Sequence, residues 1–139
     1  TLEFTGLQLE VSDHASDFQF RSFAEELALC QRYCQIYGGV TNYTPFGNGV
    51  WRSATVATIY FPFLTRMRSA PSFSISSPTN SWLRAGGSNV NVSSVTVDIA
   101  TRDNIMYNVT VSSGGTNGFG AMHLSQFGTS TIITITSEL

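Results

Sequence analysis

The residues of this chain that could take part in catalysis are few and widely spaced. The two histidines, His14 and His123, lie far apart in the sequence, and neither has a neighbouring acid in a catalytic pattern. Asp98 and Asp103 could form the carboxylate pair that cleaves a glycosidic bond. However, the alternation around Asp98 predicts the polar side of a strand, and Asp103 lies in an Arg-Asp-Asn stretch typical of a turn. We therefore interpret His123 as a surface residue of a strand, assign no catalytic residue and expect no enzymatic activity.

The two cysteines give no sign of a metal site. Cys30 and Cys34 are four residues apart, so on a helix their side chains would be poorly placed for a disulfide. With no other cysteine and no paired histidine, neither a disulfide framework nor a zinc site is indicated. We interpret both as small buried apolar residues and expect no metal and no cofactor.

A binding role has better candidates. Sugar recognition typically places aromatic faces against C–H surfaces, while Asn, Asp and Arg hydrogen-bond to the hydroxyls. Two expected loops combine these residue types, and recognition residues concentrate in loops on a rigid scaffold. The candidate ligand-binding residues are Asn80, Trp82 and Arg84 in one loop, and Tyr43, Asn48 and Trp51 in the other. The alternative that the sequence leaves open is that both tryptophans are core or subunit-interface anchors.

The composition supports a folded β-protein and excludes several classes. Of 139 residues, 42% are hydrophobic, which argues against disorder. Only 12% are charged and lysine is absent, so Ser, Thr and Asn supply most of the polar surface, as in many extracellular β-proteins. A net charge of −2 offers no basic footprint for nucleic acid. No apolar run approaches the roughly 18 residues of a membrane span, so we expect no membrane insertion.

One helix is expected near the N-terminus. Ser22 and Glu25 have the spacing of a capping box, and an apolar stripe continues from Phe23 to Tyr37. Gly38 and the glycine after it would end the helix, because glycine accepts the left-handed geometry just past a last turn. Before this helix, alternating residues 2–11 predict a half-buried strand.

The rest of the chain has β character. Strands are expected within residues 52–67, 72–76, 89–99, 104–111, 122–127 and 131–136, with a slip in the alternation at Ser93 and Ser94. Residues 40–51 and 80–84 are expected to be loops. Short strands at intervals of about ten residues predict a mainly β fold, an antiparallel, jelly-roll-like β-sandwich with one N-terminal helix.

One segment resembles a known family. Residues 8–11 read QLEV, Phe18 follows, and residues 21–33 read RSFAEELALCQRY. This resembles the C-terminal region of phage tail fibre and virion structural proteins. The resemblance implies a homotrimeric, extracellular fibre tip on the virion that contacts a host-surface polysaccharide or protein. It divides the chain into residues 1–21, which end the fibre shaft or an upstream domain, and residues 22–139, which form the head.

Two other functions remain open at this point. The chain could be a purely structural fibre, capsid or decoration module that binds only its neighbours. It could also be the tip of a tailspike that degrades polysaccharide. Neither alternative changes the expected fold.

Overall fold

The computed structural model describes residues 8–14, 16–18, 20–39, 43–128 and 130–137 of the chain, which are mainly β with a single α-helix. The elements in chain order are α1 (Phe23–Gln31), β1 (Cys34–Gly38), β2 (Pro45–Trp51), β3 (Val56–Pro62), β4 (Ser72–Ile75), the 3₁₀ turn η1 (Pro78–Asn80), β5 (Ser81–Ala85), β6 (Ser88–Ala100), β7 (Asn104–Val111), β8 (Gly120–Ser125) and β9 (Ile132–Thr136). No helix among these residues has the length and apolar content needed to cross a membrane.

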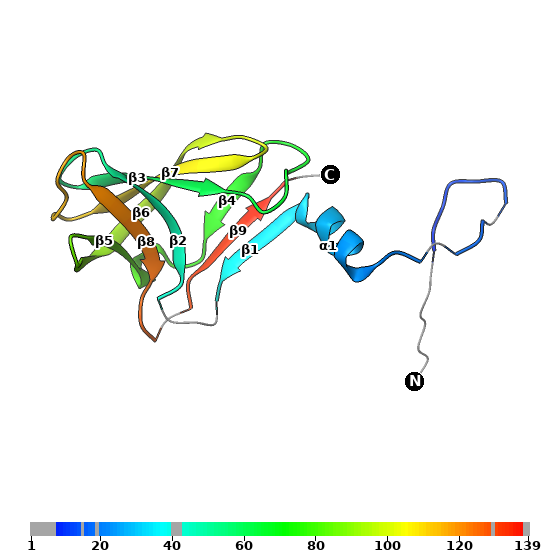
Figure 1. The fold of residues 1–139 in the computed structure, drawn as a ribbon, viewed down its shortest axis with the longest axis horizontal. Helices are drawn as coiled ribbons and strands as arrows, with labels where there is room; N and C mark the ends of the chain where they lie inside the picture. Colours follow the sequence, from blue (N-terminus) through cyan, green and yellow to red (C-terminus); the bar gives the residue numbers. More distant parts are fainter. Residues whose placement is uncertain (1–7, 15, 19, 40–42, 129, 138–139) are drawn as a thin grey trace.

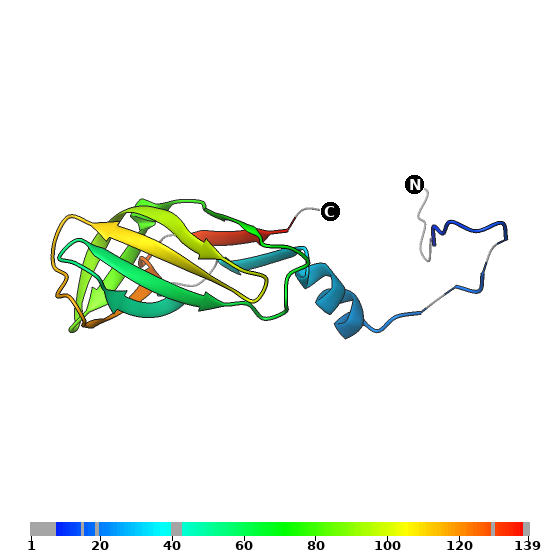
Figure 2. The same ribbon diagram turned by 90° about the horizontal axis from the view of Figure 1, so that it is seen from above.

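Six strands close into a barrel in the order β2-β3-β7-β6-β5-β8 (Figure 1). All pairings are antiparallel, and β8 completes the ring by pairing with β5 on one side and β2 on the other. The remaining strands form a second sheet in the order β1-β9-β4, seen beside the barrel in Figure 2. The prediction of a mainly β, antiparallel fold with one helix is confirmed. The jelly-roll-like sandwich is not confirmed, since the main sheet closes on itself.

The two sheets share one hydrophobic core. Alternate residues of β7, such as Tyr107 and Val109, are fully buried, as period-2 alternation requires of a strand with one inward face. Ile133 and Ile135 of β9 join the same cluster. Phe73 of β4 stacks on Tyr107 with ring centroids 5.1 Å apart. The second sheet therefore packs directly against buried side chains of the barrel.

The predicted strands after residue 52 are largely confirmed. β3, β4, β6, β7 and β9 fall within or within one residue of the expected ranges, and β8 covers most of the range expected at 122–127. The slip at Ser93 and Ser94 corresponds to a register shift between Val92 and Ser94, where β6 pairs with β7. Such a shift lets a long strand bend around a barrel.

Two segments predicted as loops are strands, and this prediction was wrong. In residues 40–51 the glycines suggested turns, but Gly47 and Gly49 lie within β2. A Cβ on Gly49 would lie 1.8 Å from the carbonyl oxygen of Thr58 on β3, so glycine is needed there for close backbone approach. Residues 81–84 likewise lie within β5, which forms a hairpin with β6 around Gly86 and Gly87.

The helix begins as predicted and ends earlier. Ser22 and Glu25 form the capping box, with each side chain bonding to the backbone N–H of the other. The helix ends at Gln31 rather than Tyr37, and the next residues form β1, which pairs with β9 from Cys34–Thr136 to Gly38–Ile132. A ladder to the buried strand β9 outweighs the helical spacing of the apolar residues, because tertiary pairing overrides local propensity.

The shorter helix changes the environment of the cysteines. Cys30 lies near the end of α1 and Cys34 begins β1, and both are free and exposed, so their interpretation as buried residues was wrong. The predicted strand at residues 2–11 falls largely outside the described residues. Its described part, residues 8–11, is not a strand, and the side chains of Leu9 and Val11 are exposed.

Gln35 of β1 connects the helix to the barrel. It is 3% exposed, and its Nε2 donates to the carbonyl oxygens of Gln31 at 3.0 Å and Thr65 at 2.8 Å. Its Oε1 accepts from the backbone N–H of Leu64 at 3.3 Å and from the hydroxyl of Tyr37. A buried amide with this many partners holds the end of α1 against the loop after β3.

Candidate functional site

The residues with catalytic potential are either buried or engaged at the surface. His123 has no exposed surface, so its interpretation as a surface strand residue was wrong. Its Nδ1 lies 3.0 Å from the hydroxyl of Tyr107 and its Nε2 lies 2.8 Å from the hydroxyl of Ser81. Both partners are also fully buried. Burial lowers the pKa of His123 to about 3 and raises that of Tyr107.

This network has one consistent proton arrangement. The hydroxyl of Ser81 donates to the carbonyl oxygen of Pro78 at 2.5 Å, which leaves its oxygen to accept from the Nε2–H of His123. Nδ1 of His123 then accepts from the hydroxyl of Tyr107. A histidine that donates to serine cannot take the serine proton. The arrangement therefore satisfies polar groups inside the barrel and does not prepare a nucleophile.

The other candidate residues for catalysis lie apart from this network. Asp98 on β6 pairs with Arg52 at 3.6 Å, and Asp103, in the turn after β6, pairs with Arg66 at 3.5 Å. The turn expected at Asp103 is confirmed by the hydrogen bond from Thr101 N to Asn104 O across it. Within the described chain, no three His, Cys, Asp or Glu side chains gather where a metal ion could be held.

Three aromatic residues form a cluster on the outside of the barrel. Tyr43, before β2, and Trp82, on β5, have ring centroids 5.6 Å apart, and Tyr43 and Phe127, after β8, are 5.8 Å apart. We call these three residues the aromatic platform. Tyr43 is 46% and Phe127 65% exposed. Tyr43 adopts a φ of 59°, which non-glycine residues rarely do, so the fold holds this side chain at some energetic cost.

Asn91 of β6 lies beside the platform in a defined orientation. It pairs with Trp82 across the β5–β6 ladder, and its Oδ1 accepts from the indole Nε1–H of Trp82 at 2.7 Å and from Nε2 of Gln126 at 3.1 Å. An indole N–H can only donate, so these bonds fix the amide with its oxygen toward Trp82. Nδ2 of Asn91 forms no bond among the described residues, so its two hydrogens are available to a ligand.

A shallow groove of about 400 Å³ lies at the end of β5 that carries Arg84. It lies between β2, β5 and β8, and we call it the arginine groove. Arg84 lies two residues after Trp82 on the same face of β5, since the residue between them, Leu83, is buried. The groove is lined mainly by Asn48, Arg84, Met122 and the glycines Gly86, Gly87 and Gly120.

Of the six predicted binding residues, two lie in the platform, two lie in the groove, and two lie outside both. Tyr43 and Trp82 meet in the platform, while Asn48 and Arg84 meet in the groove. Asn80 lies in η1, where its carbonyl oxygen accepts from Gln126 N and Thr131 Oγ1, so it supports the neighbouring chain. Trp51 does not belong to the site. It is fully buried, in agreement with the alternative that it is a core residue. Its Nε1 has no hydrogen-bond partner among the described residues.

Two residues of this surface, Phe127 and Asn91, were missed from the sequence. Phe127 was expected to belong to a strand, whereas it lies just after β8. Asn91 could have been found from the Gly86-Gly87 pair, which is a strong signal for a two-residue hairpin turn. The register that follows from that turn places Asn91 opposite Trp82.

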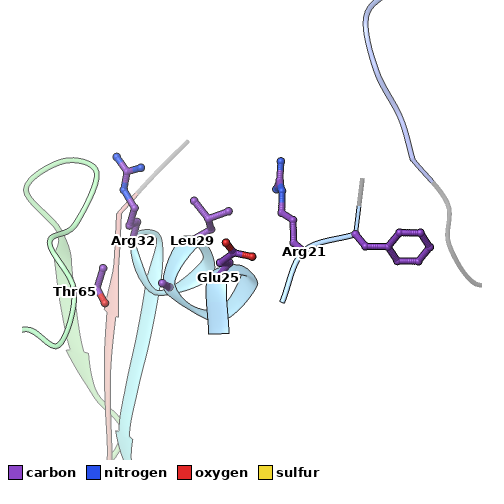
Figure 3. A pocket seen from close by; sticks show the side chains of 7 residues that line it. Arg21, Glu25, Leu29, Arg32 and Thr65 are labelled. Carbon is purple, nitrogen blue, oxygen red and sulfur yellow. The ribbon is translucent and has the colours of Figure 1, made fainter. Parts of the chain in front are cut away.

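A second surface lies at the helix. None of the residues of α1 is buried, and Phe20 and Phe23 are 91% and 81% exposed. A hollow of about 770 Å³ there is lined by Leu29 and Thr65 and by the charged residues Arg21, Glu25 and Arg32 (Figure 3). The hydrophobic side chains of this helix are thus left without a covering layer inside the described chain.

Comparisons of the chain with protein-family models, with curated proteins and with solved structures find no match.

Proposed function

We propose that this chain is the receptor-binding head of a phage tail fibre, carried at the tip of the virion. In this role it is a homotrimer joined to an upstream shaft, and it binds a host-surface glycan or protein without cleaving it. The observation that carries the proposal is the aromatic platform, in which two exposed rings and the half-buried Trp82 lie beside an oriented amide on a rigid barrel. The resemblance of residues 8–33 to tail fibre C-termini agrees with this role.

The platform is better suited to bind a sugar than to bind a flat protein surface. Aromatic rings bind the C–H face of a pyranose, and an amide with free donor hydrogens binds its hydroxyls. Tyr43, Trp82 and Phe127 supply rings from three separate segments, and Asn91 supplies the donor. Trp82 also lies opposite Leu124 on β8, which is only 2% exposed. Substitutions in the platform therefore need a check of folding.

The binding test uses the intact chain on a glycan array and on whole host cells. We expect saturable binding that Trp82→Ala weakens by at least about tenfold, the size expected for a central aromatic contact. Phe127→Ala is the second variant and Phe119→Ala its control, since each of these phenylalanines is 65% exposed. Thermal unfolding by circular dichroism establishes that each variant is folded. Loss of binding with Phe119→Ala but not Phe127→Ala would contradict the assignment of the platform.

The helix surface supports the proposed homotrimer. Exposed apolar side chains on α1 (Phe23, Leu27 and Leu29) and on β1 (Ile36) would be covered by the same elements of neighbouring copies. Light scattering should give three times the mass of one chain. Phe23→Ser and Leu27→Ser should shift the equilibrium to monomers, whereas Val97→Ser, which changes an exposed valine on β6, should not. A stable monomer of the intact chain would refute the trimer.

The same experiments separate the two alternative functions. A folded trimer that binds no host cell and no glycan would point to a structural virion module. Release of reducing sugar ends from host polysaccharide would point to a polysaccharide-degrading tip. Either result would overturn the proposed receptor-binding role.

A further inference from the structure

We infer that the arginine groove binds a carboxylate-bearing sugar residue, such as a hexuronic or nonulosonic acid, next to the sugar that stacks on the aromatic platform. This inference rests on the proposed function and names the chemical class of its ligand. Four observations carry it: the charge of the groove, the fixed orientation of Arg84, the open floor of the groove, and the position of Arg84 two residues after Trp82 on the same face of β5.

Arg84 is the one charged side chain among the described residues that line the groove. The platform residues and Asn91 are uncharged as well, so this surface has a single formal charge and it is positive. Within the described chain Arg84 has no acidic partner, in contrast to Arg52 and Arg66, which pair with aspartates. The chain as a whole has a net charge of −2, so an unpaired arginine here is a local feature and not part of a general basic surface.

The guanidinium of Arg84 is held so that one end of it faces outward. Its Nε donates to Oδ1 of Asn89 at 2.8 Å, and Asn89 lies directly opposite Arg84 in the β5–β6 ladder. Since Nε is occupied, the two Nη atoms remain as a planar pair of donors. That pair matches the two oxygens of a carboxylate, which arginine binds through parallel hydrogen bonds.

The floor of the groove is kept open by glycine. A Cβ built on Gly86, Gly87 or Gly120 would meet no heavy atom within 4 Å, so side chains at these positions would project into open space. Asn48, on the β2 side, is exposed, and its amide forms no hydrogen bond within the described chain. The groove thus offers the two Nη donors of Arg84, the amide of Asn48, and room for a pyranose between them.

The groove and the platform are spaced for adjacent sugars. Trp82 and Arg84 project from one face of β5 two residues apart, which corresponds to about 7 Å along a strand. A pyranose stacked on Trp82 would therefore place its glycosidic neighbour near Arg84. An oligosaccharide running along β5 would use both sites at once.

The test compares acidic sugars with their neutral counterparts. The probe is an array of oligosaccharides that contain hexuronate or nonulosonate, each printed beside its carboxyl-reduced form. We expect the chain to bind the acidic form at least about tenfold more tightly, because charge-assisted bidentate hydrogen bonds contribute at least that much. Raising the salt concentration should reduce this preference and leave binding to the reduced forms nearly unchanged.

Variants assign the preference to the groove. Arg84→Gln should bring the ratio of acidic to reduced binding close to one, and Arg84→Lys should restore only part of it, since lysine keeps the charge without the fork. Gly120→Val should weaken binding of the acidic forms by filling the groove, and its Cβ would meet no heavy atom within 4 Å. Arg52→Gln is the control, because it removes an arginine outside the site and should keep the full ratio.

The outcomes distinguish this inference from the proposed function. Equal binding of acidic and carboxyl-reduced glycans, or an unchanged ratio in Arg84→Gln, would overturn the carboxylate site and leave receptor binding standing. Failure of the folded trimer to bind any glycan or host cell would overturn both.

Discussion

The buried histidine makes the stability of the barrel depend on pH in a calculable way. His123 lies among Tyr107, Ser81 and the apolar core, and burial holds its pKa at about 3 in the folded protein. In the unfolded chain its pKa returns to about 6.5. Between these values the unfolded chain binds a proton that the folded protein does not. Stability is therefore present above about pH 6.5 and is lost as the pH falls toward 3.

The size of the effect follows from linkage. For one group with these two pKa values, the free energy of unfolding should fall by about 2 kcal/mol between pH 7 and pH 5. The window above pH 5 is chosen because Glu10 and Glu25, whose pKa values are lowered by hydrogen bonds from Ser16 and Ser22, affect stability only at lower pH. The measurement is urea unfolding at pH 7, 6 and 5, at one fixed protein concentration because of the proposed trimer.

The comparison variant is His123→Gln. Its amide can still donate to Ser81, but the buried hydroxyl of Tyr107 loses its acceptor, so we expect a loss of about 1–3 kcal/mol at pH 7. Because glutamine does not titrate, the variant should show little change between pH 7 and pH 5. His14→Gln, which changes an exposed side chain, is the control and should keep the wild-type slope. Equal slopes for wild type and His123→Gln would refute the reasoning.

Three further substitutions test the fold. Gly115→Ala should destabilise the barrel by about 1–3 kcal/mol or more, because its Cβ would lie 2.1 Å from Cε3 of the buried Trp51, whereas Gly120→Ala should cost far less; thermal unfolding compares them. Gln35→Leu should cost about 1–3 kcal/mol in urea unfolding, since it leaves several part-buried backbone groups without their side-chain partner. Ser22→Ala should speed amide hydrogen exchange in α1 by removing its cap and leave the melting temperature of the barrel unchanged, because the helix buries no residue.

The parts of the fold that could be predicted from the sequence are those where local pattern and tertiary role agree. β7 alternates without interruption from Asn104 to Val111, and its bounds match the prediction residue for residue. The segments predicted wrongly are those where distant pairing decides the structure. Residues 34–38 continue the helical spacing of apolar residues, but they form a strand because they pair with β9. The glycines of β2 allow close contact with β3 and do not form turns.

The candidate site, too, could be predicted from the sequence only in part. Residue type alone identified Tyr43, Trp82, Asn48 and Arg84 as binding candidates, and the structure brings them together in two pairs on one face of the barrel. Residue type could not separate Trp82 from Trp51, because that distinction depends on which face of its strand each tryptophan occupies. It also could not show that His123 is buried, since a lone histidine in an alternating strand fits either face.

The seam at which the barrel closes has a consequence for how the chain folds. β2 and β8 pair Gly49 with Ala121, about 70 residues apart in sequence, and the second sheet pairs Cys34 with Thr136, about 100 residues apart. A topology with such high contact order must lose much chain entropy before its contacts form, so we expect folding in milliseconds to seconds, not microseconds. The β5–β6 and β6–β7 hairpins can form early, whereas the strand that supplies Asn48 joins its partner β8 only through a long-range contact. The arginine groove is therefore assembled among the last features of the folding chain.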